Sequence, residues 1–154
     1  MSGLSIFLGC VFLFGLFLAC RALLVQRQIA EDALADYSYK QNNSMVEPRL
    51  SKKKYIRAYR RFYAPHKLIH MAAAFMSIAL LSLPAAGLFR FILIKLWESS
   101  GRPDSFQPGF LVFNILIMLM LIGFWTIIFF LTAQRYYKTA PISLRDEMIR
   151  AENE

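Results

Sequence analysis

The chain has 154 residues, of which 57% are hydrophobic, and it carries 18 Lys and Arg side chains against 10 Asp and Glu. A soluble domain is about 45–50% apolar, so the composition argues against a soluble protein. The length suits a few membrane helices. We expect an all-α integral membrane protein with three transmembrane helices and one interfacial amphipathic helix.

The first transmembrane helix is predicted at residues 1–25. Residues 1–20 contain no charged side chain, and about 20 apolar residues are enough to cross a bilayer. A secretory signal peptide begins with basic residues, whereas here the basic residues follow the apolar run. This order predicts a membrane anchor with its N-terminus outside. One face of the helix gathers small residues, which let a second helix approach closely: Ser5, Gly9, Gly15 and Ala19.

A basic segment at residues 26–66 follows. Residues 21–39 lack Gly and Pro and are rich in helix-forming residues, so we expect them to prolong the first helix beyond the bilayer. In residues 51–63 aromatic side chains recur at helical spacing and Lys and Arg fill most other positions, which predicts an amphipathic helix in the membrane interface. The residues expected to contact an anionic phospholipid such as cardiolipin are Lys52, Lys53, Lys54, Tyr55, Arg57, Tyr59, Arg60 and Arg61.

The basic segment also has a simpler interpretation. Its charge can serve only to set the orientation of the protein in the membrane, which requires no partner. Nucleic acid is not an expected partner, because the aromatic side chains would be embedded in lipid rather than free to stack on bases.

The second transmembrane helix is predicted at residues 67–97, with a kink near Pro84 and an outer loop at residues 98–107. His66 and His70 share one helix face, which suits an axial haem ligand or a quinone contact. The simpler interpretation is an interfacial pair near the lipid headgroups. We expect no metal, because no Cys, Asp or Glu lies nearby in the sequence to complete a site. Two small residues extend this face and are expected to pack against a neighbouring helix: Ala73 and Ser77.

The third transmembrane helix is predicted at residues 108–133 and is followed by a tail at residues 134–154. Eleven Lys and Arg lie between the first two apolar runs (residues 1–20 and 68–89) and four in the tail, whereas three lie between the second run and the third (residues 110–131). Because Lys and Arg concentrate in the inner loops of membrane proteins, the basic segment and the C-terminus are expected inside. The expected location is a bacterial inner membrane, with a mitochondrial inner membrane as the alternative.

The function is predicted mainly from what the sequence lacks. It contains no glycine-rich phosphate loop, no cysteine cluster and no carboxylate within the spans, so we expect neither an enzyme nor a cofactor. The favoured function is a small accessory or assembly subunit of a larger membrane protein complex, preferably an energy-converting electron-transfer complex, respiratory or photosynthetic. Two alternatives stay open: an electron-transfer subunit that contacts haem or quinone through His66 and His70, and a self-assembling channel or transporter.

Overall fold

The computed structural model describes residues 2–43, 51–141 and 143–153. These residues form five α-helices and one short 3-10 helix, joined by loops. In chain order the elements are α1 (Ser2–Asn42), α2 (Lys52–Tyr63), α3 (His66–Ser99), η1 (Asp104–Phe106), α4 (Leu111–Thr139) and α5 (Leu144–Asn153).

Three of the helices, α1, α3 and α4, are long and apolar enough to cross a membrane. The prediction of an all-helical chain with three such helices is therefore confirmed. Their lengths are 41, 34 and 29 residues, and about 20 residues are needed to cross the hydrocarbon core. α1 is thus about twice as long as one crossing requires, and its second half carries most of its charged side chains.

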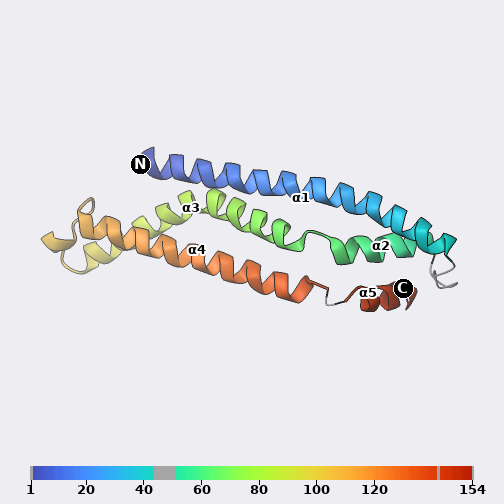
Figure 1. The fold of residues 1–154 in the computed structure, drawn as a ribbon. Coiled ribbons are helices and arrows are strands. Elements are labelled where there is room, and N and C mark those ends of the chain that lie inside the picture. Colours follow the sequence, from blue (N-terminus) through green and yellow to red (C-terminus); the bar gives the residue numbers. More distant parts are fainter. Residues whose placement is uncertain (1, 44–50, 142, 154) are drawn as a thin grey trace.

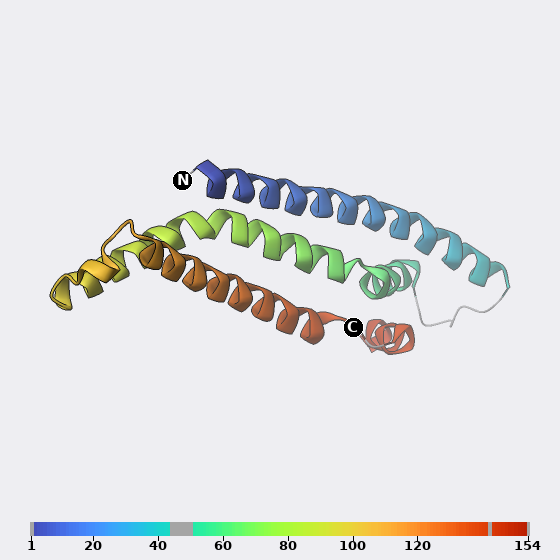
Figure 2. The ribbon, with the colours of Figure 1, turned by 60° about the vertical axis from the view of Figure 1, so that its left-hand side comes forward.

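The three long helices form a single layer. α3 lies between α1 and α4 and packs against both, as two views of the ribbon show (Figures 1 and 2). The two short helices α2 and α5 lie past the ends of α3 and α4 and pack against each other, and α2 also packs against the second half of α1. Figure 2 shows α2 and α5 nearly end-on while the long helices run across the picture, so the short helices lie across the direction of the long ones.

One buried stripe runs along most of α1. Its members are Leu8, Gly15, Leu18, Ala22, Ile29 and Ala33. Their separations of seven, three, four, seven and four residues keep them on one face of a helix. The first part of the stripe faces α3 and the last part lies beside α2, so one continuous face of α1 holds both parts of the structure together.

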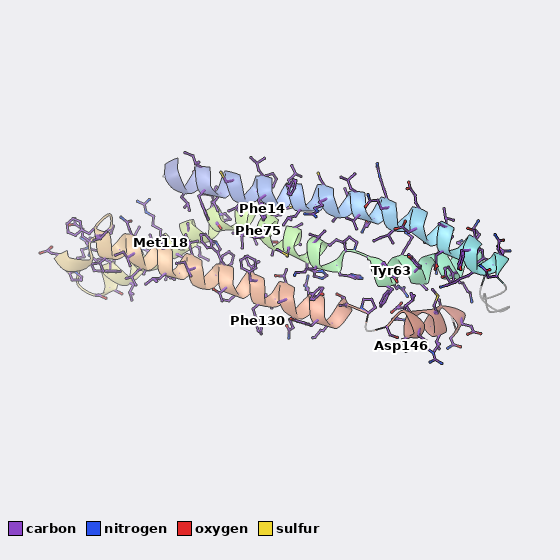
Figure 3. The ribbon with its side chains drawn as sticks, viewed as in Figure 1. Phe14, Tyr63, Phe75, Met118, Phe130 and Asp146 are labelled. Carbon is purple, nitrogen blue, oxygen red and sulfur yellow. The ribbon has the colours of Figure 1, made fainter. Side chains whose placement is uncertain are left out.

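Gly15 is where α1 approaches α3 closely. A Cβ atom added there would lie 3.0 Å from Cγ of Met76 and 3.2 Å from its backbone nitrogen. One residue earlier, the Phe14 ring meets the Phe75 ring edge-to-face with centroids 5.1 Å apart, and Figure 3 shows the two side chains between α1 and α3. Small residues such as glycine let two helix backbones approach closely.

α3 is unbroken from His66 to Ser99 although it contains Pro84. Proline lacks the backbone N–H and its ring crowds the carbonyl four residues earlier, which bends a helix. Figure 2 shows α3 changing direction in its yellow-green part. Near this bend the Ser82 side chain is completely buried, which places a polar group inside the contact with α4.

Candidate functional site

The most distinctive site lies where α2 meets the second half of α1. Ser51 begins α2 by accepting, through its hydroxyl, a hydrogen bond of 3.4 Å from the backbone nitrogen of Lys54. At the other end, Pro65 restricts the residue before it, so Ala64 adopts an extended backbone with φ −51° and ψ 140°. This junction ends α2, and it lets α3 begin at His66 in a different direction.

The face of α2 that packs against α1 is attached through Tyr55, which is only 4% exposed. Its hydroxyl donates a hydrogen bond to the Asp36 carboxylate and accepts one of 2.8 Å from Nζ of Lys40. Asp36 and Lys40, one turn apart on α1, also form an ion pair of 3.2 Å. The ring of Tyr37 packs against Tyr55 with centroids 5.4 Å apart. A phenol, a carboxylate and an ammonium thus join the two helices.

The pKa values of this cluster shift in directions that preserve it at neutral pH. The hydrogen bond from Tyr55 lowers the pKa of Asp36 below its ordinary value. Burial raises the pKa of the Tyr55 phenol, and the hydrogen bond to Tyr55 raises the pKa of Lys40. The carboxylate and the ammonium therefore stay charged while the phenol stays neutral and able to donate.

The other side of α2 is covered in part by α5. Arg61 of α2 forms an ion pair of 3.8 Å with Glu147 of α5. Nζ of Lys54 donates a hydrogen bond of 3.4 Å to the backbone oxygen of Glu152, and Ala151 is buried. α2 is therefore held between α1 and α5.

A groove of about 690 Å³ opens between α1 and α2; we call it the basic groove. It is lined by Gln26 and Ile29 of α1, by Lys52, Lys53, Ile56, Arg57, Arg60 and Arg61 of α2, and by Ala64. Five cationic side chains thus share the lining with the aliphatic side chains of Ile29, Ile56 and Ala64, which we call the apolar floor, and the lining contains no carboxylate. This combination suits an anion that also has an apolar part.

The structure divides the residues predicted to contact lipid into two groups. Most of the cations line the basic groove, but Lys54 reaches α5 instead. Tyr55, expected at headgroup depth, is buried within the chain, where its ring and hydroxyl pack on α1. Tyr59 is partly exposed and lies between two other rings, 6.4 Å from Tyr55 and 4.4 Å from Tyr63.

The two histidines bond to nearby backbone oxygens. Nε2 of His66 donates to the carbonyl of Arg61 at 2.9 Å, and Nδ1 of His70 donates to the carbonyl of His66 at 2.7 Å. His70 also lines a smaller groove of about 210 Å³ between α3 and α4, with the Tyr136 ring 5.9 Å away. Within the described part of the chain, no group of three or more His, Cys, Asp or Glu side chains is placed to hold a metal ion.

The residues predicted for helix packing are also divided. Gly15 lies in the contact between α1 and α3, and Ala19 and Ser77 are half-buried. The other three, Ser5, Gly9 and Ala73, are exposed. On α3 the buried small residues are Ala72, Ala74, Ala79 and Ser82.

The interhelical bond between Ser82 and Trp125 was not anticipated from the sequence. Nε1 of Trp125 lies 2.8 Å from the hydroxyl of Ser82. The available signal was a tryptophan in the middle of an apolar run, because its N–H needs an acceptor when buried.

Comparisons with protein-family models, with curated proteins and with solved structures found no match to this chain.

Proposed function

We propose that this protein is a non-catalytic accessory or assembly subunit of a larger membrane protein complex. The observation that carries the proposal is the single layer formed by α1, α3 and α4. Of the most apolar stretch of α4, only 6% is buried within the chain, and the corresponding values are 17% for α1 and 22% for α3. Both broad faces of the layer are therefore available to other membrane helices.

Two exposed glycines support contact with partner helices as well as with lipid. Gly9 on α1 and Gly123 on α4 are both exposed, and a Cβ added at either would meet no atom within 4 Å. One turn to either side of Gly123, Leu119 and Ile127 are 57% and 58% exposed, and Phe130, labelled in Figure 3, lies two turns after Gly123 on the same face. A notch between large apolar side chains lets a second backbone approach closely.

The proposal includes an orientation with the N-terminus outside and the C-terminus inside. Fifteen of the 18 Lys and Arg lie in the segments assigned to the inner side, which is the distribution that orients membrane proteins. The crosswise direction of α2 and α5 fits helices that lie along the inner surface while α1, α3 and α4 cross the bilayer. We further propose a bacterial or mitochondrial inner membrane, with an energy-converting complex as the first candidate partner.

The test is affinity purification of the tagged full-length chain from its native membrane in mild detergent or native nanodiscs. Mass spectrometry of the eluate identifies partners, and an absorption spectrum of the same eluate reveals haem. We expect stoichiometric co-purification with a multi-subunit membrane complex. A chain that emerges alone, self-associated and conducting solute in liposomes would contradict the proposal.

A matched pair of variants tests whether the notches are used. An added Cβ at Gly9 or Gly123 has no atom of the chain within 4 Å, so we expect Gly9→Leu/Gly123→Leu to fill both notches and lose partner subunits while the protein still folds. Met118→Leu changes an exposed side chain of α4 without filling a notch and should retain the partners. Equal retention by both variants would show that neither notch contacts a partner.

A further inference from the structure

We propose that the basic groove is a specific site for the headgroup of an anionic phospholipid, and that it prefers a headgroup with two phosphates over one with a single phosphate. The inference rests on the proposed function in one respect, the placement of α2 at the inner membrane surface. It deepens that function by naming the ligand class and the residues that bind it.

The charge of the basic groove favours a ligand with more than one negative charge. Among the described residues, Arg61 has an acidic partner in Glu147, whereas the salt bridges of this part of the chain include none for Lys52, Lys53, Arg57 or Arg60. Four cations without an acidic partner lie along one side of α2, spread over about 12 Å at 1.5 Å per residue. A single phosphodiester supplies one negative charge, so two phosphates match the groove better.

The apolar floor of the basic groove favours a ligand with an apolar part. Ile29, Ile56 and Ala64 lie among the cations in the lining. A free phosphate gains nothing from an aliphatic surface, whereas the glycerol and upper acyl chains of a lipid do. The cations and the floor together therefore favour an amphiphilic phosphate compound over a free anion.

The position of the basic groove along the chain also favours a lipid. Gln26 directly follows Val25, the last residue of the first apolar run, and Ala64 lies two residues before α3 begins. Both edges of the groove are thus close to the ends of helices that cross the membrane. On α1, Leu23 is 60% exposed and lies about one turn before Gln26, which offers acyl chains apolar surface beside the headgroup site.

The test uses the purified full-length chain in a zwitterionic detergent, with lipid retention measured by native mass spectrometry. The probes are a two-phosphate lipid (cardiolipin), a one-phosphate lipid (phosphatidylglycerol), phosphatidylcholine, and inorganic pyrophosphate as the free anion. We expect cardiolipin to bind most tightly and phosphatidylcholine least. Equal affinity for the two anionic lipids would overturn the two-phosphate preference, and displacement of lipid by equimolar pyrophosphate would assign the groove to a free anion.

The variants separate the groove from general electrostatic attraction. Replacing two cations in Arg57→Gln/Arg60→Gln should weaken cardiolipin binding about 10- to 30-fold. Lys138→Gln/Arg145→Gln removes the same charge from exposed positions outside the groove. This variant should change the affinity for cardiolipin less than twofold. An equal loss of cardiolipin affinity in both variants would contradict a specific site in the basic groove.

Two more variants address folding and the apolar floor. Arg57→Lys/Arg60→Lys keeps the charge and should retain most of the binding, which separates a lost contact from a misfolded helix. Ile56→Ser should weaken lipid binding but leave pyrophosphate binding unchanged. Because these assays use the chain alone, their outcome is independent of whether the protein co-purifies with a complex.

Discussion

The indole of Trp125 on α4 donates a hydrogen bond of 2.8 Å to the hydroxyl of Ser82 on α3. The Ser82 hydroxyl in turn donates to the backbone oxygen of Ile78, one turn earlier on α3. The Phe7 ring of α1 stacks on the Trp125 ring with centroids 5.9 Å apart. One serine thus provides the acceptor for the tryptophan at a point where side chains from all three long helices meet.

Replacing Ser82 with alanine should therefore weaken the contact between α3 and α4. The change leaves the Trp125 N–H without an acceptor in an apolar setting, and we expect a loss of about 1 kcal/mol in the free energy of unfolding. Reversible unfolding in mixed micelles measures this value. Thr126→Ala is the matched control, because Thr126 bonds only to Ile122 of its own helix; an equal loss there would argue against the interhelical bond.

Gly15→Leu should separate α1 from α3. A leucine cannot fit beside Met76 and Phe75, because even its Cβ would lie within 3.3 Å of both residues. We expect overpacking to lower the free energy of unfolding by roughly 1–3 kcal/mol. The measurement is the thermal unfolding temperature in detergent, read from the loss of the folded peak in size-exclusion chromatography after heating. Gly9→Leu is the control on the same helix, because a Cβ at Gly9 has no atom within 4 Å, and it should unfold like the wild type. Equal unfolding temperatures for the two variants would argue against a close approach of α1 and α3 at Gly15.

Tyr55→Phe should loosen α2 from α1 while keeping the packed ring. It removes the hydrogen bond to Asp36 and the one from Lys40. The side chains of these partners are about one-third exposed, so solvent moderates the effect, and we expect a cost of about 1 kcal/mol. Amide hydrogen exchange in α2 measures the change as faster exchange. Tyr39→Phe, at an exposed position on α1, should leave exchange in α2 unaltered.

The same cluster predicts how the attachment of α2 depends on pH. The pKa of Asp36 is lowered from 3.8, so its contribution is present above pH 3.8 and is lost as the pH falls through the folded value. The pKa of Tyr55 is raised from 10.0, so its contribution is present below pH 10.0 and is lost as the pH rises through the folded value. Protection of α2 amides should be level between these limits. Asp36→Asn should abolish the acid-side loss, and its persistence in that variant would assign the loss to another group.

The proposed orientation predicts opposite labelling of two loops. In a chain with Cys10→Ala and Cys20→Ala, Ser100→Cys lies between α3 and α4 and Ser143→Cys lies just before α5. A membrane-impermeant thiol reagent applied from outside should label position 100 and not position 143. Reversed labelling would place the basic groove on the outer side and remove the basis for its proposed lipid contact.

Hydropathy was sufficient to predict three apolar helices, because each crossing needs an uninterrupted apolar run. Contacts between helices were harder to predict, since periodicity shows which residues share a face but not what covers that face. Tyr55 has the aromatic character of an interfacial residue, yet it faces Asp36 and Lys40 because the second half of α1 lies beside α2. On α3, Ala73 was expected in the packing, but Ala72 and Ala74 are buried instead. In an alanine-rich run many faces carry small residues, so composition alone does not select one.

Because α1 is one unbroken helix, a tilt of its apolar part also moves its far end. Residues 26–42 extend about 25 Å past its apolar part at 1.5 Å per residue, and no proline interrupts them. Membrane helices tilt when the bilayer thins, and a tilt of about 10° would swing the far end of α1 by about 4 Å. The cluster around Tyr55 lies near that end, whereas α2 is also tied through Ala64 and Pro65 to the start of α3. A change in bilayer thickness would therefore displace the second half of α1 relative to α2 and change the shape of the basic groove between them.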